Sequence, residues 1–97
     1  MKTLADIKNT LMVHKTDLAQ KYFLKHIGIF GSYVKNTQTA KSDLDVLVDF
    51  EEVPTLFDFV GLKEELSDLV GVNVDLVMQS ALKPRIGQRI LAEVVLL

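Results

Sequence analysis

The stretch LDVLVDF, from Leu44 to Phe50, constrains the fold of this chain most strongly. Its apolar residues are nearly continuous, and a polar segment precedes it while Glu51, Glu52 and Pro54 follow it. Such a run is typical of a central strand that is covered on both faces. The chain must therefore supply neighbouring strands and helices that pack on the sheet.

Apolar spacing predicts these other elements. The residues Leu4, Ile7, Leu11, Leu18 and Tyr22 recur at steps of three, four and seven and predict a first helix, with a kink near His14 left open. HIGIF, ending at Gly31, predicts a buried strand, and a helical turn can follow it. A helix is expected after the capping pair Thr55 and Asp58, closed by Gly71, and then a strand VNVDLVM. Pro84 begins a last helix, PRIGQRILAEV.

The predicted fold class is therefore α/β (α+β), a small mixed β-sheet flanked by helices in the order α-β-β-α-β-α. The first two strands follow each other without a long helix between them, so we expect them to pair antiparallel. A chain of 97 residues is expected to form one domain, residues 1–97.

Composition excludes several classes of protein. The net charge is −2, which argues against extensive nucleic-acid binding, and the absence of cysteine removes thiolate chemistry. No apolar run is long enough for a membrane span, and the first residues do not resemble a signal peptide. We expect a soluble cytoplasmic protein.

Two aspartates stand at the start of the central strand. Asp43 and Asp45 point to the same side if the strand extends back to Asp43, because side chains alternate along a strand. Two neighbouring carboxylates repel each other, and a divalent cation such as Mg²⁺ relieves that repulsion. A simpler interpretation makes Asp43 a turn or cap residue, and the two aspartates alone favour it.

Asp75 strengthens the metal interpretation. It lies between Val74 and Leu76 in the third predicted strand, and an acid inside an apolar strand must face water, a cation or a partner. If that strand neighbours the central one, three acids can hold two metal ions that activate a hydroxyl and neutralise a leaving phosphate. Asp75 can also take the hydroxyl proton directly.

Gly31 and Ser32 follow the first strand directly. Glycine allows a sharp turn and close approach to a ligand, and amides at the start of a helical turn bind phosphates. Lys35 adds a positive charge nearby. A plain strand-to-loop turn is the simpler alternative, and the spacing of a P-loop is missing.

The combination is more specific than its parts. Gly31-Ser32, nine residues, and then Ser42-Asp43-x-Asp45 resembles the signature of the DNA polymerase β-like nucleotidyltransferase superfamily, most closely its minimal (MNT) branch. That signature reads Gly-Ser-x-Ala-Arg-Gly-x5-Ser-Asp-x-Asp. Here Lys35 and Asn36 replace its Arg and Gly, and Val34 replaces its Ala. Lysine keeps the charge but loses the bidentate fork, whereas asparagine tolerates a left-handed backbone.

The resemblance implies a function and a set of site residues. Nucleotide binding would fall to Gly31, Ser32, Lys35 and Ser42, and Mg²⁺ binding and catalysis to Asp43, Asp45 and Asp75. The family transfers a nucleoside monophosphate from a nucleoside triphosphate, here expected to be ATP, to a hydroxyl and releases pyrophosphate. Small members typically accompany a HEPN toxin and act as its antitoxin, by adding AMP to a tyrosine of the toxin, by binding it, or both.

Two other functions remain open. One is a binding module that blocks the toxin without catalysis, and its hallmark would be loss of the three acids. The other is a small-molecule transferase of the aminoglycoside-modifying kind, which usually carries an additional substrate domain. Among the remaining residues, His14 and His26 are interpreted as surface or capping groups and the pair Phe57 and Phe59 as core. The basic patch of Lys83, Arg85 and Arg89 is interpreted as a solvated face.

Overall fold

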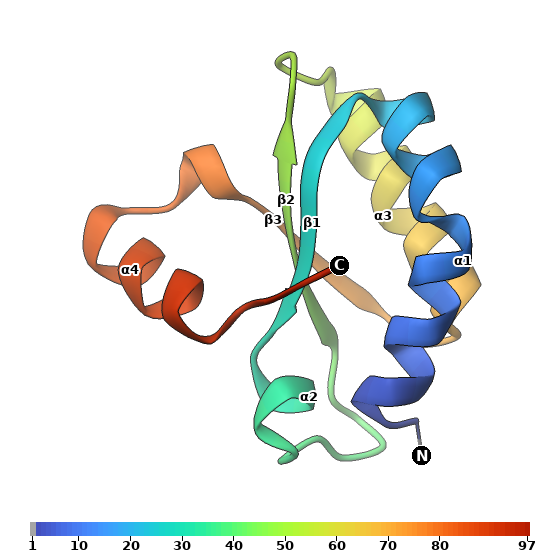
Figure 1. The fold of residues 1–97 in the computed structure, drawn as a ribbon, viewed down its shortest axis with the longest axis vertical. Helices are drawn as coiled ribbons and strands as arrows, with labels where there is room; N and C mark the ends of the chain where they lie inside the picture. Colours follow the sequence, from blue (N-terminus) through green and yellow to red (C-terminus); the bar gives the residue numbers. More distant parts are fainter. Residues whose placement is uncertain (1) are drawn as a thin grey trace.

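A computed structural model describes residues 2–97. The helices are α1 (Leu4–Tyr22), α2 (Ser32–Lys35), α3 (Leu56–Val70) and α4 (Pro84–Glu93), with a 3₁₀ turn over Gln79–Ala81. The strands are β1 (Leu24–Phe30), β2 (Leu44–Phe50), β3 (Val74–Met78) and β4 (Val95–Leu96). Figure 1 shows α1 and α3 side by side on one face of the sheet, with α4 on the other side. None of the helices in the described chain has the length and apolar character of a membrane span.

The sheet is mixed, as predicted. The strand order is β3-β2-β1-β4, in which β1 pairs antiparallel with both β2 and β4 while β2 and β3 run parallel. The central position of LDVLVDF follows from this order. The parallel pair is connected through α3, as parallel strands require.

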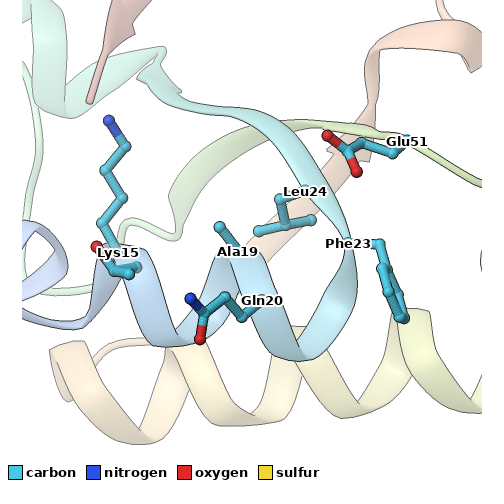
Figure 2. Close-up of a pocket in the computed structure, with 7 residues that line it drawn as sticks. Lys15, Ala19, Gln20, Phe23, Leu24 and Glu51 are labelled. Atoms are coloured by element: carbon cyan, nitrogen blue, oxygen red, sulfur yellow. The ribbon is translucent and has the colours of Figure 1, made fainter.

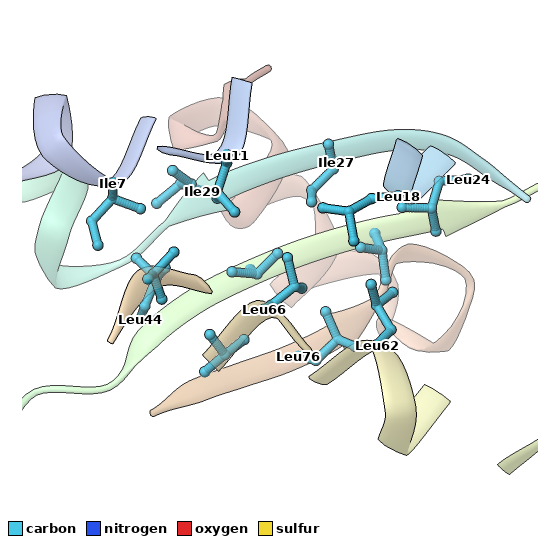
Figure 3. Packing of buried hydrophobic residues seen from close by; sticks show 14 of the residues in the cluster. Ile7, Leu11, Leu18, Leu24, Ile27, Ile29, Leu44, Leu62, Leu66 and Leu76 are labelled. Carbon is cyan, nitrogen blue, oxygen red and sulfur yellow. The ribbon is translucent and has the colours of Figure 1, made fainter. Parts of the chain in front are cut away.

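The core lies between the sheet and the two helices on its covered face (Figure 3). The sheet and each of the two helices contribute side chains that are almost fully buried: Ile7, Leu11 and Leu18 from α1, Leu62, Leu66 and Val70 from α3, and Ile29, Val46 and Val48 from the strands. Burying a side chain of this size contributes about 1.5–3 kcal/mol relative to leaving it in water. The capping box predicted at the start of α3 is present between Thr55 and Asp58. A second one, which was not predicted, forms between Thr3 and Asp6 at the start of α1.

Three details differ from the sequence prediction. First, the second helix that was left open after His14 does not form, because α1 is one continuous helix from Leu4 to Tyr22. Second, the last helix ends at Glu93, and the residues after it add the edge strand β4 to β1. Third, Phe57 is 92% exposed, and only Phe59 packs against the core. Residues two positions apart lie on different faces of a helix, so the two phenylalanines cannot both point inward.

Candidate active site

The candidate site lies where the carboxyl end of β1 meets the amino ends of β2 and β3. Asp45 in β2 is the register partner of Phe30 in β1 and of Asp75 in β3. The strands β2 and β3 are therefore adjacent, which was the condition set for the metal interpretation. Their pairing places these two aspartates beside each other. Gly31 follows Phe30 and completes the group.

Gly31 makes its close approach to Asp45 because it has no side chain. A Cβ at Gly31 would fall on Oδ2 of Asp45, and the backbone φ of 78° is one that other residues rarely adopt. Both facts require glycine at this position. The Gly31 turn and the Asp45 carboxylate thus form one continuous surface.

Crowded acids dominate the electrostatics of the site. Burial, the charge of Asp75 and a hydrogen bond shared with it raise the pKa of Asp45 from 3.8 to about 6, and Asp43 and Glu93 add to the effect. Carboxylates raise one another's pKa in this way when nothing neutralises them. A cation placed among them would remove that cost.

Asp43 occupies the loop immediately before β2. The strand begins at Leu44, whose amide donates to the carbonyl of Asn73, so the alternation expected if the strand reached Asp43 does not apply to it. Asp43 is exposed, as is Asp75, whereas Asp45 is half-buried. Within residues 2–97 no three acidic or histidine side chains are already gathered around a single metal position. The donors are nevertheless all carboxylate oxygens, the ligands that Mg²⁺ prefers.

The short helix α2 follows Gly31 as a tight turn. The amides of Val34 and Lys35 both donate to the carbonyl of Gly31, at 3.1 Å each. Asn36 closes the turn in the left-handed conformation, with a φ of 59°. The loop shape expected where the family has glycine is therefore present with asparagine.

Ser32 and Ser42 are placed differently with respect to the acids. Ser32 is the first residue of α2, directly after Gly31, and its carbonyl accepts from the amide of Thr37 at 2.9 Å. The Ser42 hydroxyl accepts from the amide of Thr39 at 2.8 Å, and the Ser42 amide donates back to the carbonyl of Thr39 at 3.1 Å. In this structure Ser42 therefore closes the loop that leads to Asp43 and to the start of β2.

Glu93 is a member of the site that the sequence reasoning missed. Its Oε1 accepts a hydrogen bond from the Gly31 amide at 3.2 Å, and its Oε2 lies 3.4 Å from Nζ of Lys35. It reaches them because α4 folds back over the far side of the sheet (Figure 1). No local pattern indicates this, since Glu93 stands in an ordinary amphipathic helix far along the chain from Gly31.

The surface also has a hollow that lies away from these acids. One of about 490 Å³ lies between the end of α1 and the turn into β1, with Lys15, Gln20, Phe23 and Glu51 among its lining residues (Figure 2). It contains no residue of the acidic group and brings no two carboxylates together. Its chemistry gives no reason to place the reaction there.

A small mixed sheet that brings aspartates from neighbouring strands beside a Gly-Ser turn defines a nucleotidyltransferase. The chain belongs to the nucleotidyltransferase domain family, whose model matches residues 11–97. It is 47% identical to the protein adenylyltransferase MntA of Thermococcus cleftensis over 95 residues, which cover 98% of this chain and 96% of that one. It is 52% identical over 83 residues to a protein of Methanocaldococcus jannaschii named as a protein adenylyltransferase, covering 86% of this chain and 85% of that one.

Solved structures agree with this assignment. One assigned by name to the minimal nucleotidyltransferases is 34% identical, with a TM-score of 0.74 over 90% of this chain and 92% of that chain. A complex of a tri-AMPylated HEPN toxin with an MNT antitoxin, from Shewanella oneidensis, contains the same fold at 19% identity, with a TM-score of 0.66 over 94% of this chain and 70% of that chain. The predicted family and fold are confirmed, and the chain is an enzyme of the nucleotidyltransferase class.

Proposed function

We propose that this chain is a single-domain cytoplasmic enzyme that transfers AMP from ATP to a hydroxyl of a partner protein. The acceptor is a tyrosine of a HEPN toxin, with which the chain forms a hetero-oligomer as its antitoxin. The observation that carries the proposal is the convergence of Gly31, Asp45 and Asp75 at one end of the sheet. The names of the relatives, and of the toxin complex with the same fold, support the choice of acceptor.

In this proposal the three aspartates hold Mg²⁺. The carboxylates of Asp43, Asp45 and Asp75 would supply the ligands. Two ions are expected, and they would activate the attacking hydroxyl and neutralise the leaving oxygens. The raised pKa of Asp45 supports a cation at this point, because a positive charge would offset the mutual repulsion of the carboxylates.

Other residues bind the nucleotide, and one of the three aspartates also accepts the proton. Gly31 and Ser32 present their backbone to the triphosphate, Lys35 adds charge, and Ser42 holds the loop that carries Asp43. The acceptor oxygen bonds to the α-phosphorus while the bond from that phosphorus to pyrophosphate breaks. The exposed Asp75 takes the hydroxyl proton, so that charge and atoms balance.

Intact-protein mass spectrometry of the partner tests the proposal. The proposed HEPN partner would be incubated with this chain, Mg²⁺ and ATP, beside Asp43→Asn and Asp45→Asn variants. The exposed Asp17 of α1, changed to Asn, serves as the matched control. We expect a gain of one or more AMP units with the wild type and with Asp17→Asn, and none with the two site variants.

The alternative is an antitoxin that acts by binding alone. A stable complex with the HEPN protein, but no mass gain under any of these conditions, would favour that alternative and reject protein adenylylation of this partner. The presence of all three acids is the observation that ranks catalysis first.

A further inference from the structure

Glu93 joins the end of α4 to the turn that follows β1. One carboxylate oxygen accepts a hydrogen bond from the Gly31 amide at 3.2 Å. The other lies 3.4 Å from the Lys35 ammonium. A backbone amide and a lysine ammonium at the start of a turn are a typical pair of donors for a phosphate. In this structure the chain's own carboxylate occupies both.

The position of Glu93 is otherwise unfavourable. It is the last residue of α4, where the partial negative charge of the helix end disfavours an acid. Its charge is also among those that raise the pKa of Asp45. Among the described residues, the contacts with Gly31 and Lys35 offset these two unfavourable effects on Glu93.

We infer that Glu93 occupies the place of a substrate phosphate in the nucleotide-free protein and must be displaced when the triphosphate binds. Carboxylate and phosphate oxygens compete for the same two donors, and both are anions beside an already acidic group. Glu93 therefore lowers the affinity of the site for polyphosphate. This inference rests on the proposed function for its choice of ligand.

The structure provides a route for the displaced side chain. The side chains of Lys35 and Glu93 are 58% and 29% exposed, so a ligand can reach the pair. A hollow of about 180 Å³ lies beside it, with Phe30, Lys35, Arg89 and Glu93 among its lining residues. Arg89 stands four residues before Glu93 on α4, a spacing at which oppositely charged side chains pair. Glu93 can therefore turn from Lys35 toward Arg89 without unfolding the helix.

Binding of inorganic tripolyphosphate tests the inference without requiring catalysis. Isothermal titration calorimetry would compare the wild type with Glu93→Gln and Glu93→Ala, and with Glu64→Gln on the exposed side of α3 as control. We expect both Glu93 variants to bind about tenfold more tightly, the equivalent of about 1.4 kcal/mol. The control should match the wild type.

The wild-type protein supplies a second readout that depends on no variant folding. Titration with tripolyphosphate should shift the NMR resonances of the Gly31 amide and the Glu93 carboxyl carbon together, as the contact between them breaks. Equal or weaker binding by the Glu93 variants, no binding by any of the proteins, or an unmoved Glu93 resonance would each overturn the inference. Tighter binding by the variants, with no AMP transfer to the HEPN protein, would retain it and reject the proposed function instead.

Discussion

Asp45 and Asp75 are register partners across the parallel strands β2 and β3. Neighbouring strands lie about 4.8 Å apart, so two carboxylates in register on one side are forced together unless the side chains turn away. The pKa of Asp45 rises to about 6 through burial, the charge of Asp75 and a hydrogen bond shared with it. The fold therefore accepts an electrostatic cost at this point.

That cost should appear as a dependence of stability on pH. Because the native state raises the pKa of Asp45 from 3.8 to about 6, it binds more protons than the unfolded chain between these values. The free energy of unfolding therefore falls as pH rises through this window. Asp45→Asn removes the effect. We expect the variant to be more stable than the wild type at pH 7.5, by on the order of 1 kcal/mol after solvent screening.

Urea unfolding at two pH values measures this difference. Below about pH 3 the wild-type carboxyl is protonated in both states, so the gain from Asp45→Asn should disappear. Asp68→Asn, an exposed acid of α3, controls for the loss of one net charge. A variant as stable as the wild type at pH 7.5 would contradict the prediction.

Magnesium should stabilise the wild type for the same electrostatic reason. A ligand that binds only the folded state adds about 1.4 kcal/mol at ten times its Kd. We expect the thermal midpoint of the wild type to rise with added Mg²⁺ and to fall back when EDTA is added. Asp45→Asn should respond little, and Asp68→Asn should respond as the wild type does. An equal response from all three proteins would place the cation elsewhere.

Gly31→Ala should damage the site more than an ordinary glycine substitution. The new Cβ would fall on Oδ2 of Asp45, and the φ of 78° strains any side chain. We expect a loss of about 1–3 kcal/mol in stability and loss of AMP transfer. Gly61→Ala is the matched control, because a Cβ there meets only Tyr22, at 3.6 Å or more, and lies inside a helix where alanine is favoured. Similar stability of the two variants in urea unfolding would contradict this account.

The local pattern of the sequence predicted most of the fold and the placement of Asp45 beside Asp75 in the candidate site. The continuous apolar run identified β2, the acid within VDLV identified Asp75, and the left-handed Asn36 was anticipated from its tolerance of that conformation. Glu93 was missed because it reaches Gly31 from a helix distant in sequence, and its place depends on how α4 crosses the sheet. The short edge strand β4 was missed for a similar reason, since two residues carry no periodicity.

The two sides of α3 should differ sharply in their tolerance of substitution. Leu62 is fully buried between the sheet and α1, so Leu62→Ala should lower the free energy of unfolding by about 2–5 kcal/mol. Phe57 is 92% exposed, so Phe57→Ala should change it by no more than about 0.5 kcal/mol. Urea unfolding of the isolated chain measures both. A loss of more than about 1 kcal/mol from Phe57→Ala would contradict the exposed position of this side chain.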